Sequence, residues 1–131
     1  MMISTKGRYA LMIMTYLAEH QEDGPVSLKD IAENNDMGIK YLEIIVASLN
    51  KAGLVDSIRG KKGGYRLNKK TDEYSLLSIL QVAEGSLAPV ACVKEEGFCA
   101  NAPNCKTHKM WKELDDLIEN YLASKTLKDI L

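Results

Sequence analysis

Residues 26–67 place two short helices, a tight turn and a β-hairpin in immediate succession, and few folds accommodate that order. Apolar residues at helical spacing predict one helix over residues 28–34 and a second over residues 39–52. Ser27 precedes the first helix as an N-cap, and Gly53 follows the second as a left-handed terminating residue. Two helices joined by so short a turn have the size and spacing of a helix-turn-helix.

A basic, glycine-rich hairpin follows the helix pair directly. Short strands are predicted over residues 54–58 and 65–67, and the loop between them holds three glycines in six residues. Residues 59–70 contain six lysines and arginines and no acidic residue, so this segment carries +6 and the rest of the chain −7. The net charge of −1 therefore conceals a strongly basic hairpin. Together these elements outline a mainly helical winged helix, which we expect to occupy residues 1–85.

The N-terminal segment has some features of a secretion signal. Lys6 and Arg8 precede a run over residues 9–18 that is apolar except for Thr15. The run is too short to span a bilayer, and no small-residue cleavage site follows it. We therefore expect a mostly buried first helix with Thr5 as its N-cap, in a cytoplasmic protein without membrane contact and with reduced cysteines.

The basic hairpin predicts contact with double-stranded DNA. Its positive charges, including those of Lys61 and Lys62, can neutralise phosphates and release counterions. Arg59 is the residue best suited to a narrow minor groove, where an arginine is favoured electrostatically. The alternative is a solvated hairpin whose charges keep a sheet edge soluble.

The second helix of the pair is expected to turn its N-terminal end towards the major groove. Lys40 is suited to a guanine edge or a phosphate there, and Glu43 to a hydrogen bond from a cytosine amine. Tyr41 lies between them, and core packing is an equal alternative for its ring. These three residues are the predicted sequence-recognising side chains.

Two further helices are predicted in the second half of the chain. The first runs from near Ser75 to Gly85 and is apolar on more than one face, so it is expected to be buried. An irregular, cysteine-bearing loop over residues 86–105 separates it from a last helix over residues 106–131. An apolar stripe on the last helix suits either packing onto the domain or pairing with a second subunit. The stripe comprises Met110, Leu114, Leu117 and Tyr121, broadened by Trp111, Ile118 and Leu122.

All three cysteines lie within fourteen residues, and a histidine follows them. Cys92, Cys99, Cys105 and His108 form the pattern C-x6-C-x5-C-x2-H. An odd number of cysteines argues against a disulfide framework, whereas these four side chains could hold a zinc ion or an iron–sulfur cluster. The gaps are wider than in usual zinc pairs and suit a cluster, and three free thiols are the third alternative. If the last helix begins near Cys105, then Cys105 and His108 project together from its first turn, where the helix dipole stabilises a thiolate.

Several segments resemble the winged-helix regulators of the IscR/NsrR family. They are Ser4-Thr5-Lys6-Gly7-Arg8-Tyr9-Ala10, Tyr41-Leu42-Glu43, Gly53-Leu54-Val55, and Arg59-Gly60 with Gly63-Gly64-Tyr65. The resemblance covers essentially the whole chain. It implies a homodimer, joined by a long C-terminal dimerisation helix, that controls transcription at a palindromic operator.

The resemblance also implies a ligand set. In the IscR-like branch three cysteines and a histidine bind a 2Fe–2S cluster, and they match Cys92, Cys99, Cys105 and His108. The first gap is six residues here rather than the five of the IscR-type pattern. In the nitric-oxide-sensing branch a carboxylate near the N-terminus of the other subunit can serve as a ligand, but Arg8 occupies that position and cannot ligate iron. The IscR-like branch is therefore the closer match.

These features predict a dimeric, sequence-specific regulator whose DNA binding responds to iron–sulfur cluster status, with cluster biogenesis or related stress genes under its control. One alternative is a thiol- or zinc-dependent repressor of the same family that responds to nitric oxide or to cysteine metabolism. Another is a small iron–sulfur electron-transfer protein, which would bind no operator. An enzyme is not expected, because the sequence offers no nucleophile–base pair, no phosphate-binding glycine loop and only two histidines.

Overall fold

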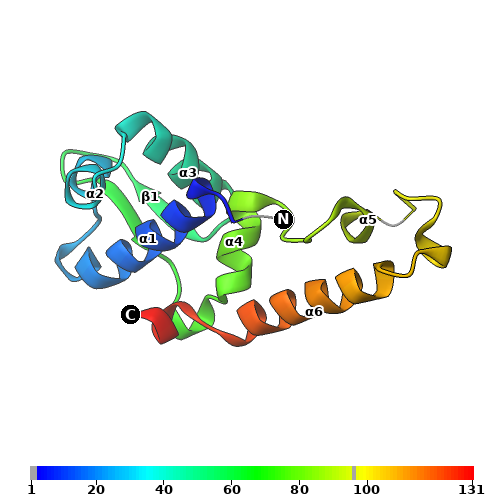
Figure 1. Cartoon of the computed structure of the whole chain (residues 1–131). Helices are drawn as coiled ribbons and strands as arrows, with labels where there is room; N and C mark the ends of the chain where they lie inside the picture. The colour runs from blue at the N-terminus through cyan, green and yellow to red at the C-terminus, as the bar shows by residue number, and fades with distance from the viewer. Residues whose placement is uncertain (1–2, 96) are drawn as a thin grey trace.

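The computed structural model describes residues 3–95 and 97–131, and it has the predicted mainly helical architecture with one small hairpin (Figure 1). The α-helices and strands are α1 (Thr5–His20), α2 (Leu28–Asn35), α3 (Ile39–Lys51), β1 (Val55–Ile58), β2 (Gly64–Leu67), α4 (Leu76–Glu84), α5 (Ala91–Lys94) and α6 (His108–Ser124). Short 3-10 helices cover Gln21–Asp23, Thr71–Glu73, Ala102–Asn104 and Leu127–Ile130. Helices α1 to α4 and the hairpin surround one core, and α5 projects away from it together with the start of α6. Across the described ranges no helix is long and apolar enough to cross a membrane.

The helix-turn-helix forms as the sequence predicted. The Ser27 hydroxyl accepts a hydrogen bond from the backbone N–H of Asp30 at 3.1 Å, which caps the first turn of α2. Asp36 adopts a left-handed conformation (φ 52°) after α2, and Gly53 (φ 78°) does so after α3. One face of α3 is buried among the other helices, and it consists of Leu42, Ile45, Val46 and Leu49. The opposite face of α3 is consequently left to solvent.

The apolar run near the N-terminus forms α1 as expected, but its cap differs. Thr5 is already the first helical residue, and Ser4 occupies the N-cap position. Oε1 of Glu84, on α4, accepts hydrogen bonds from the backbone N–H of Ser4 (2.8 Å), the Ser4 hydroxyl (2.7 Å) and the backbone N–H of Gly7 (2.9 Å). The prediction of Thr5 as N-cap is therefore wrong, because a carboxylate from another helix binds these N–H groups.

The two strands pair antiparallel and form the wing, with Val55 opposite Leu67. Tyr65 also exchanges two backbone hydrogen bonds of 2.8 Å with Val26, which tie the wing to the segment before α2. Gly64 is required beside this contact, since a Cβ atom there would collide with the Val26 carbonyl. The wing therefore rises from a fixed base.

Tyr74 holds both ends of the hairpin at that base. Its side chain is buried, and its hydroxyl donates to the Leu54 carbonyl at 2.9 Å. The same oxygen accepts hydrogen bonds from the backbone N–H groups of Asn68 (2.9 Å) and Lys69 (3.0 Å). One side chain thus joins the residue before β1 to the residues after β2.

The last helix, α6, is shorter than the sequence predicted. It begins at His108 and ends at Ser124, whereas a helix over residues 106–131 was expected. The chain then returns to the body, where the backbone N–H of Leu127 donates to the Tyr74 carbonyl at 2.9 Å. The Leu127 side chain is fully buried in the core. Residues after α6 therefore pack with the winged helix and anchor one end of α6 to it (Figure 1).

Candidate nucleic-acid interface and cysteine site

The predicted DNA-contacting residues of α3 lie at the start of that helix. Lys40 and Glu43 are exposed. The Tyr41 ring packs edge-on against Tyr9 of α1, with ring centroids 5.7 Å apart, and it keeps 37% of its surface exposed. Tyr41 therefore contacts the body of the domain and still remains accessible to a partner.

The outward face of α3 also carries residues that were not predicted from the sequence. At 3.6 residues per turn, Lys40, Ile44, Ala47 and Lys51 form one line along the helix, and all four are exposed. Ile44 and Ala47 were missed because they are apolar. Their position opposite the buried stripe of a helix-turn-helix is the signal that identifies them.

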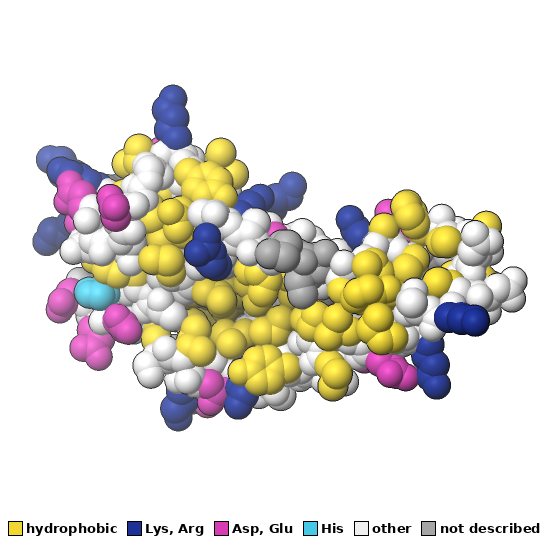
Figure 2. Space-filling model, viewed as in Figure 1, with side chains coloured by type: hydrophobic (Ala, Val, Ile, Leu, Met, Phe, Trp, Pro, Cys, Tyr) yellow, Lys and Arg dark blue, Asp and Glu magenta, His cyan; other side chains and the backbone are white. Residues whose placement is uncertain are grey.

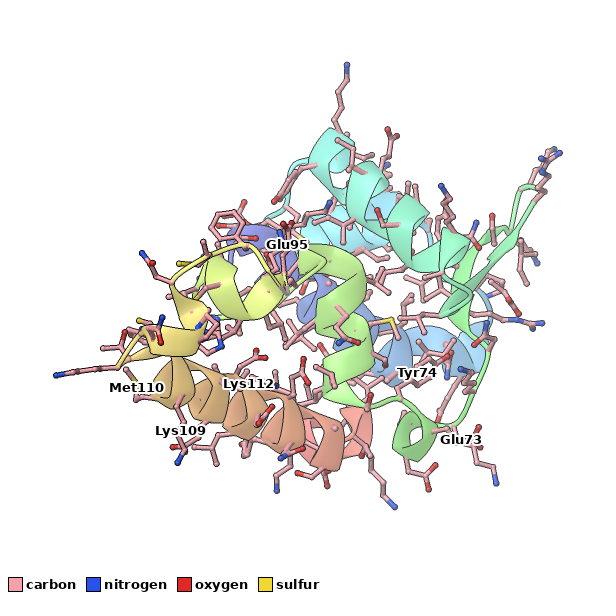
Figure 3. All side chains as sticks on the ribbon, turned by 90° about the vertical axis from the view of Figure 1, so that its right-hand side faces the viewer. Glu73, Tyr74, Glu95, Lys109, Met110 and Lys112 are labelled. Carbon is pink, nitrogen blue, oxygen red and sulfur yellow. The ribbon has the colours of Figure 1, made fainter. Side chains whose placement is uncertain are left out.

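The wing presents its positive charges to solvent. Arg59, Lys61 and Lys62 are exposed near the turn of the hairpin. The ion pairs found among the described residues all lie on α2 and α6, so these three charges are available to phosphates. Figure 3 shows α3 and the hairpin on the side of the molecule away from α6, where one DNA duplex can meet both.

The cysteine-bearing loop and the start of α6 line a pocket of about 900 Å³ that is open to solvent on one side. Cys92, Cys99 and His108 line it together. Lys94 adds positive charge to the lining, which suits an anionic group, whereas the Lys112 ammonium is paired with Asp116 at 2.6 Å. The structure thus brings three of the four predicted ligands to one hollow.

Two buried side-chain atoms in the described part of the chain lack a hydrogen-bond partner, namely Nδ1 of His108 and Oδ1 of Asp115. They lie on the same side of α6, two turns apart, and Asp115 is only 6% exposed. A buried polar atom without a partner is unfavourable, so Nδ1 of His108 is available to a ligand. Asp115 was missed in the sequence because its burial depends on how α6 packs.

Cys105 lies apart from the other predicted ligands and outside the pocket lining. It is exposed and extended, and α6 begins three residues after it, so the expected projection of Cys105 and His108 from one helical turn is wrong. The Cys105 sulfur instead lies 3.3 Å from the Thr107 hydroxyl. This hydroxyl, with the backbone N–H groups of Thr107 and His108, lowers the pKa of the Cys105 thiol below its usual value. Cys105 is consequently an accessible thiol with a lowered pKa.

The side chains at this end of the molecule are of the types that bind an iron–sulfur cluster, but their positions in this structure do not converge on one point. Three thiols and an imidazole are ligands that such clusters accept. Within residues 3–95 and 97–131, no three His, Cys, Asp or Glu side chains lie close enough together to hold a metal ion. Ligation by all four would require Cys92, Cys99 and His108 to draw closer together across the pocket, and the loop to bring Cys105 towards them.

Helix α6 has two apolar faces that differ in exposure. The face towards α4 and α5 is partly buried and carries Trp111, Ile118 and Leu122 around the buried Asp115. The other face is the predicted stripe, which is exposed and comprises Met110, Leu114, Leu117 and Tyr121. Leu117 is 67% exposed, and Figure 2 shows hydrophobic side chains gathered along this part of the molecule. The inner face thus packs onto the rest of the chain and leaves the stripe exposed, with the Lys125 ammonium 5.8 Å from the centroid of the Tyr121 ring at one end of it.

Comparison with known proteins identifies relatives along the whole chain. The model of the Rrf2 family, described as an iron-dependent transcriptional regulator, matches residues 3–131. The HTH-type transcriptional regulator IscR of Aliivibrio salmonicida is 37% identical over 131 residues, which are 100% of this chain and 77% of that protein.

Solved structures of transcriptional regulators are also similar to this chain. CymR, the global cysteine regulator of B. subtilis, is 40% identical with a TM-score of 0.80, over 99% of this chain and 95% of that one. T. potens IscR is 39% identical with a TM-score of 0.77, over 99% of this chain and 85% of that one. These matches confirm the family resemblance, the winged-helix fold and the expectation that the protein is not an enzyme. The chain belongs to the Rrf2 family of DNA-binding transcriptional regulators.

Proposed function

We propose that this protein is a homodimeric, sequence-specific regulator whose operator binding depends on a 2Fe–2S cluster held by Cys92, Cys99, Cys105 and His108. The observation that carries the proposal is the pocket that Cys92, Cys99 and His108 line together. Nδ1 of His108 has no hydrogen-bond partner and is therefore available as a ligand. The description of the family as iron-dependent points the same way. We further propose that the protein acts in the cytoplasm and controls genes of cluster biogenesis or of related stress responses.

The protein's own residues supply a chemically consistent site. A bound cluster would provide a redox-active iron centre with thiolate ligands. Lys94, which lines the pocket, would offset part of the negative charge of those thiolates. Cys105 has a lowered pKa and lies outside the pocket, and the loop that carries all three cysteines, and that would have to rearrange, joins α4 to α6. A change in this loop would therefore reach both the body of the domain and α6.

We further propose that the exposed stripe of α6 pairs with the same stripe of a second copy. Its apolar residues recur at spacings of four, three and four, which is the pattern of one helix packing along another. A two-fold dimer duplicates α3 and the wing about its axis, and a palindromic operator has the matching symmetry.

Anaerobic reconstitution with iron and sulfide tests the cluster. We expect a coloured protein with about two irons and two sulfides per chain, and strongly reduced absorbance in His108→Ala and Cys105→Ser. His20→Ala is the matched control, because His20 is the other histidine and lies exposed at the end of α1. The operator is then titrated with the loaded and cluster-free forms. Equal affinity and equal sequence preference in both forms would overturn cluster sensing.

A second candidate is a thiol-based regulator, and the exposure of Cys105, together with its lowered pKa, favours it. The similarity to CymR, which is named as a cysteine regulator, supports the same alternative. A colourless protein whose DNA binding changes with peroxide and recovers with dithiothreitol would favour this candidate. One zinc per chain would instead favour a zinc-dependent repressor.

A further inference from the structure

The exposed line along α3 is apolar at its centre. Lys40 and Lys51 lie at its ends, with Ile44 and Ala47 between them. Ile44 keeps 56% of its surface exposed, more than the other large apolar side chains of α3. A single surface isoleucine is ordinary, but this one occupies the middle of the face that a helix-turn-helix turns towards DNA.

Packing within the chain does not account for isoleucine at this position. Ile44 lies on the side of α3 opposite Leu42, Ile45 and Leu49, so it adds little to the core. A β-branched side chain also has a lower helix propensity than alanine, leucine or lysine. Contact with a partner surface is the better explanation.

The major groove offers one apolar feature, which is the 5-methyl group of thymine. A branched aliphatic side chain packs against that methyl group but makes no hydrogen bond to any base edge. Ala47, about one turn further on, is small enough to let α3 approach the bases closely. Lys40 and Lys51 at the two ends of the line are suited to the phosphates on either side of the groove.

We propose that Ile44 is a specificity-determining residue that contacts the methyl group of a thymine in each operator half-site. The inference rests on the proposed recognition of DNA through α3. Apolar recognition by Ile44 then adds to the polar contacts expected from Lys40 and Glu43. The operator should contain a thymine at one fixed position in each half-site.

Replacement of thymine by deoxyuridine in the operator tests this inference, because it removes only the methyl group. A preferred operator is first selected from random duplexes with the wild-type protein, and each symmetry-related pair of thymines is then replaced in turn. We expect the wild-type affinity to fall about fourfold per methyl group at one such pair. Ile44→Ala should bind the unmodified operator more weakly and should not respond to the replacement at that pair.

Two further variants sharpen the test. Ile39→Ala is the matched control, since Ile39 is 47% exposed on the same helix but lies off the outward line, and this variant should keep the full response. Ile44→Gln should shift the selected base at that position from thymine towards adenine, which pairs with a glutamine amide. All three substitutions are at exposed positions, and circular dichroism checks that each variant is folded.

The outcomes separate this inference from the proposal on which it rests. The inference is overturned if no replacement weakens wild-type binding, or if Ile44→Ala responds as the wild type does, although specific DNA binding then stands. If the selection enriches no sequence, the proposal that the protein is a sequence-specific regulator is overturned, and the proposed role of Ile44 is overturned with it.

Discussion

Oε1 of Glu84 lies 2.9 Å from the backbone nitrogen of Gly7 and accepts its hydrogen bond, so that the last residue of α4 caps the first turn of α1. The same oxygen accepts two hydrogen bonds from Ser4. A Cβ atom on Gly7 would collide with this oxygen, which explains a glycine within a helix. Glu84 is separated from the cysteine-bearing loop by Gly85 alone, and α1 carries the Tyr9 ring that contacts Tyr41 of α3. The cap therefore lies between the two candidate sites.

Glu84→Ala is expected to lower the free energy of unfolding by about 1–2 kcal/mol, because it removes a charged acceptor from three donors at a helix N-terminus. Glu84→Gln keeps an acceptor oxygen and should lose less. Urea unfolding at neutral pH measures both. Glu19→Ala, at an exposed position near the other end of α1, is the control and should change stability by about 0.5 kcal/mol or less. Equal losses in Glu84→Ala and Glu19→Ala would contradict the cap.

Gly7→Ala gives an independent check of the same contact. When Gly7→Ala is made in the wild-type background, the new methyl group displaces the Glu84 carboxylate. The stability lost with this cap opposes the gain of about 1 kcal/mol from the higher helix propensity of alanine. With Glu84→Ala already present there is no cap to lose, so Gly7→Ala should then stabilise the protein. Unfolding curves of the four proteins form a double-mutant cycle. Strictly additive effects would mean that Gly7 and Glu84 are not coupled.

Tyr74→Phe is expected to destabilise the protein by about 1–3 kcal/mol, because it strips a buried hydroxyl from the Leu54 carbonyl and from two backbone N–H groups. Burial raises the pKa of Tyr74 above its ordinary value, so the folded state holds the phenolic proton more tightly than the unfolded state. Its contribution to stability is complete below about pH 10 and declines as the pH rises through the folded-state pKa. Unfolding measured from pH 8 upwards should therefore show the difference between wild type and Tyr74→Phe shrinking above pH 10. A difference that stays constant would contradict this role.

Arg59→Ala is expected to weaken operator binding and to reduce its salt dependence, since Arg59 is exposed on the wing and available to DNA. Loss of one counterion-releasing contact should make the negative slope of log affinity against log salt concentration shallower by about 0.9 per protomer. Lys128→Ala removes the same charge from an exposed position of the 3-10 helix after α6 and serves as the control. Titrations at several salt concentrations measure both slopes. Identical slopes for the two variants would argue against DNA contact by Arg59.

The parts of the fold that depend on near neighbours in sequence could be predicted. The Ser27 cap, the left-handed Gly53 and the antiparallel hairpin each involve a few adjacent residues, and all three are present. The basic wing followed from charge counted along residues 59–70. Local rules of capping, turn formation and periodicity are sufficient for these features.

The remaining features depend on contacts between distant segments. Glu84 and Gly7 are 77 residues apart, and the sequence around either gives no sign of the other. The return of Leu127 to the core likewise depends on contacts of its 3-10 helix with α1 and with the Thr71–Glu73 segment. At the cysteine site the donor types were evident, but the Thr107 hydroxyl and the later start of α6 set where Cys105 lies. Long-range packing decided each of these outcomes.

Leu117→Glu is expected to convert the proposed dimer to a folded monomer, because Leu117 is the most exposed member of the apolar stripe on α6 and a buried, unpaired carboxylate would be costly there. Ala123→Glu is the matched control, since it adds the same charge to an exposed position on the polar side of the same helix. Sedimentation velocity should show half the wild-type mass for Leu117→Glu alone, and circular dichroism should show unchanged helix content. Operator affinity should fall with the dimer, because a single half-site then supplies all of the contacts. A wild type that sediments as a monomer, or equal dissociation of both variants, would show that the stripe serves some other surface.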